Sequence, residues 1–506
     1  ENFMNRTSFI RPLFTRRAKI AYRNALDAEA VQRSELTWLI ASSRDTVVGK
    51  KFGFKDIRSY EEYRERVMLQ EYSDIRPLVE RMIAGERNVL WRGVTRNFAQ
   101  SSGTSDGKSK YVPVTSDSFK RNHYAGGFDV VARYLTLYPE SRMFDGKGFI
   151  LGGSFANELT LPKGVVVGDL SANLIEHINP LANMVRIPSK RIALMEDWSR
   201  KLPALVKASL RENVTNLSGV PSWFLVVLKE VLKASGAQEL HEVWPNLEVF
   251  FHGGIAFDPY REQYNHIIDP ARMRYLETYN ASEGFFAVQC DRDTPGMLLL
   301  MDIGVFYEFI PLDETGKETD RALASWEVEA GATYSLVITA CNGLWRYKIG
   351  DTVTVTSVNP LKITISGRTK HFINAFGEEL MVHNADAAIA ATCRELGCEI
   401  ANYTAAPVYA ADKTRGRHEW LIEFSRKPAS IEEFADMLDT KLREVNSDYD
   451  AKRTGNIFLD RLSVVEAPAG LFDRWLASTG KLGGQRKVPR LSNDRHLIEP
   501  MLKLMR

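Results

Sequence analysis

The chain has 506 residues, which exceeds the length that one hydrophobic core usually serves, so we expect about two or three domains. Hydrophobic residues make up 44% of the chain and charged residues 26%, a balance typical of a globular protein that folds in water. The 66 basic and 64 acidic residues leave a net charge of +2, which offers no electrostatic footprint for nucleic acid.

Membrane insertion and an oxidising compartment are also disfavoured. The longest uninterrupted apolar run, Trp223–Leu228, is far too short to cross a bilayer, and the N-terminal residues carry no secretory pattern. The four cysteines form no CxxC pair, and no histidine stands at zinc-finger spacing from them. We therefore expect structural thiols and a cytoplasmic protein with no membrane partner.

The first hundred residues predict helices. Apolar residues recur at helical spacing from about Phe14 to Ala41, and Ser59–Glu62 has the form of a capping box that opens a second helix. Arg76-Pro77 predicts the start of a third helix, which ends near Gly85. The apolar triplet Val89–Trp91 predicts a strand that leads toward the next segment.

That segment, residues 101–110 (SSGTSDGKSK), combines hydroxyls, two glycines and two lysines and has no apolar side chain. Glycines allow successive backbone N–H groups to converge into an anion-binding nest, and serine and threonine hydroxyls add neutral donors. Lys108 and Lys110 bring positive charge. The segment therefore predicts a polyphosphate-binding loop, and the alternative is a flexible surface linker.

A P-loop NTPase is disfavoured by two features of the same loop. Gly103 and Gly107 enclose three residues, whereas the Walker motif needs four. The Walker loop also leads directly into a helix, but here an alternating segment with a proline follows, Tyr111–Thr115. A helix start appears only at Thr115–Ser118, so we expect the loop to join one strand to another.

The middle of the chain alternates helices and buried strands. We expect helices over 119–138 and over most of 191–235, where Pro203 and Pro221 mark helix starts. Strands are expected at the ranges 148–153, 165–167, 247–251, 276–279, 296–301, 306–310, 334–339 and 345–349. Early helices, parallel strands in the middle and many later strands predict a large α/β domain with a partly β subdomain.

A domain boundary is expected near residues 367–370, which divides the chain into 1–370 and 371–506. Beyond the boundary the pattern restarts with a helix over 384–396, a strand over 420–424 and a helix that a capping box opens at Ser430. A segment of this length suits an independent α+β domain.

Three polar groups stand at or near predicted strand ends, where ligands of open α/β sheets collect. Tyr279 could stack on a base, and the hard carboxylate oxygen of Glu283 could coordinate magnesium. Asp351 could accept hydrogen bonds from both hydroxyls of a ribose. The alternatives are a loop glutamate that faces water and an aspartate in an ordinary turn.

Three further positions have both a functional and an ordinary interpretation. Gly253-Gly254 lets the backbone approach a planar ligand, or forms a tight turn. Arg368 contacts a ligand or is a linker charge, and Lys487 lies in a glycine-led basic loop that alone is typical of a solvated surface. No HExxH or GxSxG motif occurs, so a zincin or a serine hydrolase has no support.

In this order the segments resemble the acyl-adenylate-forming enzymes, and more closely the acyl acid amido synthetases first known as auxin-inducible Gretchen Hagen proteins. The similarity runs through nearly the whole chain from about residue 45. The segments that carry it are Ser101–Pro113, Trp244–Asn246, Tyr279–Glu283, Arg346–Asp351, Leu442–Arg453 and Gln485–Arg490. The sequence departs from the plant proteins at His252–Gly254 and Asn280-Ala281, and over 140–240, where the acyl pocket is expected.

The resemblance implies a role for each matched residue. It assigns the phosphate loop to Ser101, Ser102, Gly103, Thr104, Ser105 and Lys110. For the nucleoside, it assigns adenine stacking to Tyr279, the backbone beside adenine to Gly253 and Gly254, and ribose binding to Asp351. It places Arg368 near the ribose and the hinge between the domains. It assigns an α-phosphate contact to Ser282, magnesium binding to Glu283 and assistance in adenylation to Lys487.

The resemblance also implies the fold and the reaction. The expected fold is a large N-terminal adenylate-forming domain, with helices around β-sheets and a β-barrel-like subdomain, and a smaller mobile α+β domain. The expected enzyme uses ATP and Mg²⁺ to adenylate a small carboxylic acid and then transfers the acyl group to an amine, which we expect to be an amino acid. The alternatives are an acyl-CoA ligase that shares the adenylation step and a nucleotide-binding module without catalysis.

Overall fold

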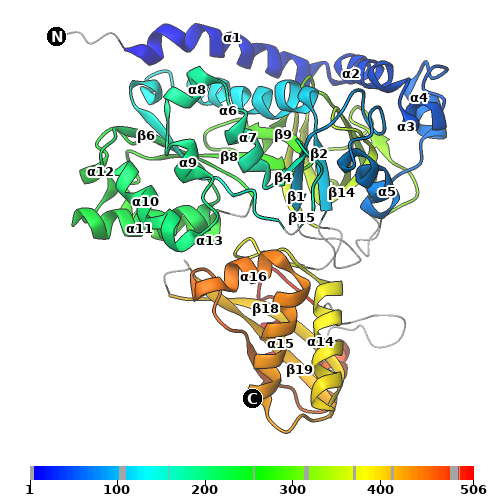
Figure 1. Ribbon diagram of the computed structural model, residues 1–506, viewed down its shortest axis with the longest axis vertical. Coiled ribbons are helices and arrows are strands. Elements are labelled where there is room, and N and C mark those ends of the chain that lie inside the picture. The colour runs from blue at the N-terminus through cyan, green and yellow to red at the C-terminus, as the bar shows by residue number, and fades with distance from the viewer. Residues whose placement is uncertain are drawn as a thin grey trace. The chain divides into compact units, whose positions relative to one another are not determined.

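The computed structural model describes residues 5–101, 110–157, 159–254, 257–312, 318–368, 372–411, 415–478, 488 and 490–505. The described residues fall into two compact units, a large unit up to residue 368 and a small unit from residue 372 (Figure 1). Within these residues, no helix combines the length and the apolarity that crossing a bilayer requires. The four cysteines are free thiols, as expected.

A sheet of 12 strands forms the centre of the large unit. Its strands, in spatial order, are β12 (Leu323–Ala324), β11 (Val305–Pro311), β13 (Thr333–Ala340), β14 (Leu344–Val358), β15 (Leu361–Arg368), β10 (Met297–Leu299), β9 (Gly284–Gln289), β8 (Arg274–Ala281), β7 (Val249–His252), β6 (Val214–Gly219), β3 (Lys147–Ile150) and β5 (Arg186–Ile187). The strands from β8 to β5 pair in parallel, and the others pair antiparallel. The predicted α/β fold is therefore confirmed, and the late antiparallel strands continue the parallel sheet.

Helices cover both faces of the parallel strands, as a parallel sheet requires (Figure 1). Consecutive residues of β7 point to opposite faces. Phe250 packs with α10 (Trp198–Ser209) and α11 (Pro221–Ser235), whereas Phe251 packs with α6 (Tyr124–Leu137). The remaining helices here are η2 (Met143–Asp145), α7 (Leu170–Glu176), α8 (Pro180–Met184), α9 (Lys190–Ala193), α12 (Leu240–Val243) and α13 (Asp258–Ile267).

The N-terminal helices differ from the prediction at their starts. α1 (Arg6–Leu26) begins before Phe14, and a second helix, α2 (Ala28–Ser43), follows directly. α1 lies along α6, where the rings of Phe14 and Phe128 stack with centroids 4.2 Å apart. The other helices of this region are α3 (Val47–Lys51), α4 (Tyr60–Arg66) and α5 (Tyr72–Ile83).

Two prolines expected at helix starts lie inside their helices, so these two predictions are wrong. α5 begins five residues before Pro77, because Glu71 and Asp74 form a reciprocal capping box there. α10 likewise begins before Pro203, at a cap where the Asp197 side chain accepts from Ser199 N. The predicted strand at Val89–Trp91 is also wrong, since these residues form a buried irregular segment.

A three-stranded sheet carries the two ends of the predicted phosphate loop. β1 (Asn97–Ser101) pairs antiparallel with β2 (Lys110–Val114) and parallel with β4 (Val166–Gly168). The loop therefore joins strand to strand, as predicted. Thr115 Oγ1 then accepts from Ser118 N and opens η1 (Ser118–His123), a π-helical turn that leads into α6.

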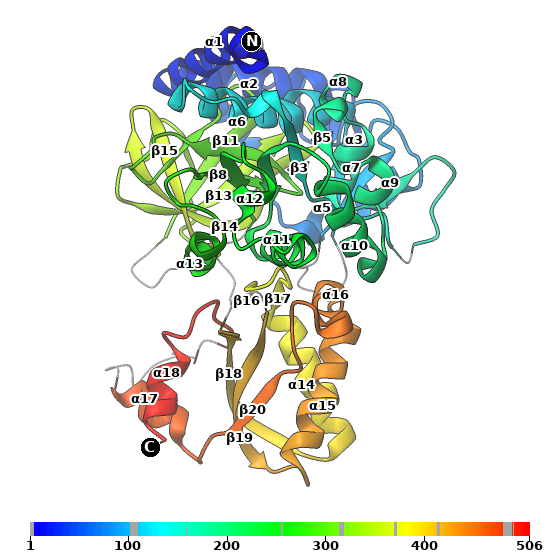
Figure 2. The same cartoon turned by 90° about the vertical axis from the view of Figure 1, so that its left-hand side faces the viewer.

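The small unit is an α+β fold with a three-stranded sheet (Figure 2). Its elements are β16 (Phe372–Ile373), β17 (Leu380–Met381), α14 (Val382–Leu396), β18 (Glu399–Tyr409), β19 (Gly416–Arg426), α15 (Ile431–Val445), α16 (Ser447–Arg453), η3 (Thr454–Asn456), β20 (Ser463–Glu466), α17 (Leu471–Ser478) and α18 (Ile498–Lys503). The predicted capping serine is confirmed, because the Ser430 side chain accepts from Glu433 N at the start of α15. Helices α14 and α15 lie on one face of the sheet, and α17 and α18 lie on the other.

Candidate active site

Several candidate residues gather where β7 and β8 end. The two strands are parallel neighbours, with His252 opposite Glu277, so the glycine pair after β7 lies beside the last residues of β8. A Cβ atom on Gly253 would stand 2.6 Å from the Thr278 carbonyl oxygen, and Gly254 has a φ of +84°. At Gly253 a side chain would clash with the neighbouring backbone, and at Gly254 the positive φ disfavours any residue with a Cβ atom. The contact of this turn with a planar ligand stays a prediction.

Tyr279 and Asp351 meet although 72 residues separate them in the chain. The phenol of Tyr279 donates a 2.6 Å hydrogen bond to Asp351 Oδ2, and both residues are buried, with exposed fractions of 4% and 6%. The Tyr279 ring also packs edge-on against Phe286, with centroids 5.0 Å apart. The ring and the carboxylate therefore hold each other in fixed orientations at the end of β8.

The expected position of Asp351 just past a short strand is wrong. β14 runs from Leu344 to Val358, so Asp351 lies inside it, opposite Arg368 of β15. The residues after Asp351, Thr352–Thr356, alternate threonine and valine, and these β-branched side chains favour a strand. Only the backbone of Arg368 is described, and it pairs with the same aspartate that the sequence assigns to the ribose.

The base of the predicted phosphate loop reaches the same strand. Ser101 and Lys110 face each other across the β1–β2 ladder, and Lys110 Nζ donates to the hydroxyl of Tyr347 in β14 at 3.3 Å. Tyr347 lies four residues before Asp351 in the chain. The candidate loop residues Ser102, Gly103, Thr104 and Ser105 lie outside the described residues, and so does Lys487.

Ser282 and Glu283 occupy the turn between β8 and β9. Glu283 is buried, with an exposed fraction of 7%, and its main-chain carbonyl accepts a 2.9 Å hydrogen bond from the Asn342 side chain. The alternative of a loop glutamate that faces water is therefore wrong.

No group of three or more metal-binding side chains occurs among the residues that the structure describes. Mg²⁺ is usually held by one or two carboxylates together with substrate phosphates, so a single buried glutamate fits that ion.

Two structural residues at this end of the sheet escaped the sequence analysis. Asn342 holds the Glu283 turn, and the dipeptide Asn342-Gly343 between two predicted strands was a readable hairpin signal. Lys201 of α10 donates to the carbonyls of Gly152 and Gly153 after β3, at 2.5 and 3.4 Å. Burial lowers the pKa of Lys201 to about 8, and Asp169 opposes part of that shift. A lysine within a helical pattern gives no sign of such burial.

Three family models match the chain. The N-terminal domain of the GH3 family matches residues 19–273, its central domain matches 298–368, and its C-terminal domain matches 383–496. The chain belongs to the GH3 family. The resemblance to the Gretchen Hagen proteins is therefore confirmed.

Curated relatives of this GH3 chain are distant in sequence. Indole-3-acetic acid-amido synthetase GH3.3 of Arabidopsis thaliana is 23% identical over 94% of this chain and 91% of its own length. Indole-3-acetic acid-amido synthetase GH3.8 of Oryza sativa subsp. indica is 24% identical over 65% of this chain. The chain spans 64% of that rice protein's length.

Solved structures share the fold of this GH3 chain. The Arabidopsis GH3.15 acyl acid amido synthetase in complex with 2,4-DB has a TM-score of 0.63 at 16% identity, and the match covers 98% of this chain and 96% of that chain. A 2-hydroxyisobutyryl-CoA ligase in complex with 2-HIB-AMP and CoA has a TM-score of 0.56 at 13% identity. The match covers 95% of this chain and 92% of the ligase chain. These likenesses show that the chain shares the fold of both proteins.

Proposed function

We propose that this GH3 protein is an ATP-dependent acyl acid amido synthetase that joins a small carboxylic acid to an amine, namely an amino acid. Its curated relatives carry amido synthetase names, and the predicted function agrees with them. The observation that carries the proposal is the buried contact between Tyr279 and Asp351 beside the Gly253-Gly254 turn. Near the carboxyl end of β8, where ligands of such sheets collect, it joins the ring assigned to base stacking and the carboxylate assigned to the ribose.

The proposed reaction has two steps. The carboxylate of the acid attacks the α-phosphorus of ATP, pyrophosphate leaves, and an acyl-adenylate forms. The amine nitrogen then attacks the acyl carbon, the C–O bond to phosphate breaks, AMP leaves with the electron pair, and the nitrogen loses one proton to solvent to give the amide. Adenylation is needed because a carboxylate is a poor electrophile with a poor leaving group.

The chain's own residues mainly position the reactants and stabilise charge. The phosphate loop, from Ser101 to Lys110, donates to the phosphates, and Tyr279 and Asp351 hold adenine and ribose. Glu283 would hold Mg²⁺, which neutralises charge on the phosphates when bound. Lys487, on the small domain, stabilises charge shared between carboxylate and α-phosphate. This role follows from the family resemblance.

The division of labour between two domains is part of the proposal. We take residues 1–370 as the ATP- and acyl-binding domain and 371–506 as a mobile domain whose closure separates the two half-reactions. We also propose a cytoplasmic location, because four free thiols suit a reducing compartment.

The test is to measure AMP and pyrophosphate formation from ATP with a panel of carboxylic acids, each with and without amino acids. We expect at least one acid to give AMP and an amide that depend on both substrates. Parallel reactions with coenzyme A separate the nearest alternative, since formation of a thioester alone would identify an acyl-CoA ligase. Tight ATP binding with no AMP from any acid would instead favour the non-catalytic module.

A further inference from the structure

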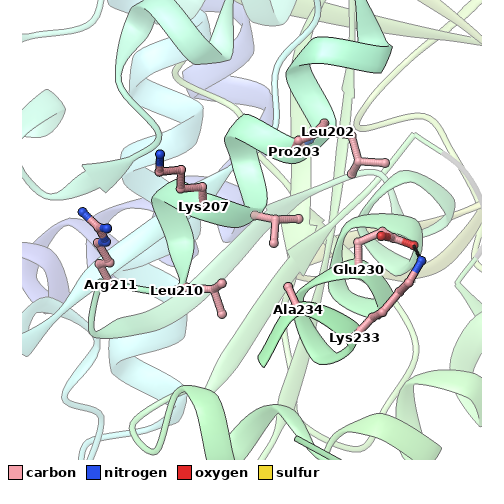
Figure 3. Close-up of a pocket in the computed structure, with 9 residues that line it drawn as sticks. Leu202, Pro203, Lys207, Leu210, Arg211, Glu230, Lys233 and Ala234 are labelled. Atoms are coloured by element: carbon pink, nitrogen blue, oxygen red, sulfur yellow. Dashed lines mark ion pairs between the residues drawn. The ribbon is translucent and has the colours of Figure 1, made fainter. Parts of the chain in front are cut away.

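A groove lies on the surface of the large unit between α10 and α11. Its volume is about 620 Å³, within the range of small-molecule sites. The floor is apolar and consists of Leu202 and Val206 from α10, Leu210 directly after it, and Ala234 from α11 (Figure 3). Leu202, Val206 and Leu210 are spaced four apart, and Leu210 caps α10 with helical backbone angles, so the three form one stripe that faces the second helix.

Charged side chains border this apolar floor on two sides. Figure 3 shows Lys207 and Arg211 together on one flank and the pair of Lys233 and Glu230 on the other. Lys233 Nζ lies 3.8 Å from Glu230 Oε1, so these two charges compensate each other. Within the described residues, the side chains of Lys207 and Arg211 make no hydrogen bond or ion pair. One flank therefore carries two uncompensated positive charges beside an apolar surface.

The groove is separate from the candidate active site. At its start, α10 contacts the loop that follows β3 through Lys201. At its end, the Ser209 carbonyl accepts from Trp244 Nε1, which lies before the first residue of β7. The groove follows the second half of α10, toward the edge where the parallel strands begin. Strands β7, β8 and β14, which bear the candidate nucleotide residues, contribute no residue to it.

We propose that this groove binds the anion of a medium-chain fatty acid. The alkyl chain lies over Leu202, Val206, Leu210 and Ala234, and the carboxylate lies at the flank formed by Lys207 and Arg211. The arginine fork matches a carboxylate in a bidentate geometry, and the apolar stems of both cations extend the floor. A compact polyanion would leave the apolar floor without a partner, and a neutral lipid would leave the two charges without one.

The proposal is tested by calorimetric titration of the full chain with decanoate below its critical micelle concentration. We expect saturable binding that weakens at least about tenfold in the double variant Lys207→Ala/Arg211→Ala. The matched control is Arg16→Ala/Lys19→Ala, which removes two exposed charges from α1 and is expected to keep wild-type affinity. Decanol, which lacks the charge, is expected to bind at least about tenfold more weakly than decanoate.

A second variant tests the apolar floor. Leu210→Asp places a carboxylate there and is expected to abolish decanoate binding, while circular dichroism and the thermal midpoint check that the chain stays folded. AMP formation is measured on the same samples, so loss of the groove and loss of the proposed activity are separate results. Absence of decanoate binding to the wild-type chain would overturn the proposal. So would equal affinity in the two double variants, or equal affinity for decanol.

Discussion

Asp351 accepts a buried hydrogen bond from Tyr279, and this contact joins β8 to β14, which β15, β10 and β9 separate in the strand order of the sheet. If Asp351 binds the ribose hydroxyls, the phenol of Tyr279 fixes the orientation of the Asp351 carboxylate and so the direction in which Oδ1 of Asp351 points. Tyr279→Phe keeps the ring but removes the donor, and a hydrogen bond to a charged group is worth about 1.5–3 kcal/mol. We therefore expect the KM for ATP to rise about tenfold or more, with a smaller change in kcat.

The matched control is Tyr449→Phe in the small unit. Tyr449 donates to Asp439 at 2.7 Å, so this variant removes the same kind of buried bond away from the candidate site. Steady-state pyrophosphate release with varied ATP measures both variants. An unchanged KM in Tyr279→Phe, or an equal rise in both, would contradict the proposed role of the pair.

Lys487 is expected to act in the first half-reaction, where a negative carboxylate approaches a negative phosphate. Lys487→Ala should therefore slow acyl-adenylate formation by about 100-fold or more and affect amide formation from a supplied acyl-adenylate much less. The control is Lys481→Ala, a neighbouring lysine with no assigned role. Single-turnover measurements of each step decide the matter, and equal losses in both steps would remove the assigned function.

Two neighbouring glycines of α6 are expected to respond in opposite directions to alanine. A Cβ on Gly126 would stand 2.3 Å from Cγ of Phe285, whereas a Cβ on Gly127 meets no atom within 4 Å. Gly126→Ala should lower the free energy of unfolding by about 1–3 kcal/mol through overpacking. Gly127→Ala should raise it by about 0.4–1 kcal/mol, because alanine restricts the unfolded chain at an exposed helical position.

The thermal midpoint of each variant checks this prediction, because the two substitutions add the same methyl group one residue apart. A shift in the same direction for both would show that Phe285 does not lie against α6 as described.

Local signals in the sequence predicted local structure well. The capping serines at 59 and 430 mark true helix starts, because a cap needs only residues within one turn. The strand after the phosphate loop was also readable, since Pro113 and the alternating pattern excluded a helix directly after the loop. The strand before the loop, β1, was missed, because the prediction placed that strand at Val89–Trp91. Pro77 and Pro203 misled for the same local reason, because a stronger side-chain cap stands a few residues before each proline.

Contacts between distant segments were not readable from residue patterns. The bond between Tyr279 and Asp351 depends on the order of strands in the sheet, which alternation of apolar residues does not encode. The same holds for Lys201, whose position on α10 gives no sign that its amine reaches carbonyls after β3. Only the family resemblance grouped Tyr279 and Asp351 before the fold was known.

The small unit contains a buried pair of titratable residues that predicts its response to acid. Glu378 and His418 are both fully buried, and Glu378 Oε1 lies 2.8 Å from His418 Nε2. Burial raises the pKa of Glu378. The hydrogen bond with His418, the electrostatic attraction to the same histidine and the hydrogen bond from the Phe376 N–H together outweigh burial, so the pKa of Glu378 lies below its usual value. The unfolded chain then binds more protons near pH 4, and stability falls as the pH drops through the folded pKa.

Glu378→Gln should therefore flatten the loss of stability between about pH 5 and pH 3, since the variant has no carboxylate to protonate. At neutral pH the same change should lower the free energy of unfolding by about 1–3 kcal/mol, because the charged acceptor is lost. The control is Glu433→Gln, an exposed glutamate on α15, which should keep the wild-type slope. Thermal midpoints measured across this range test the prediction, and parallel curves for wild type and both variants would show that the buried pair does not control the acid response.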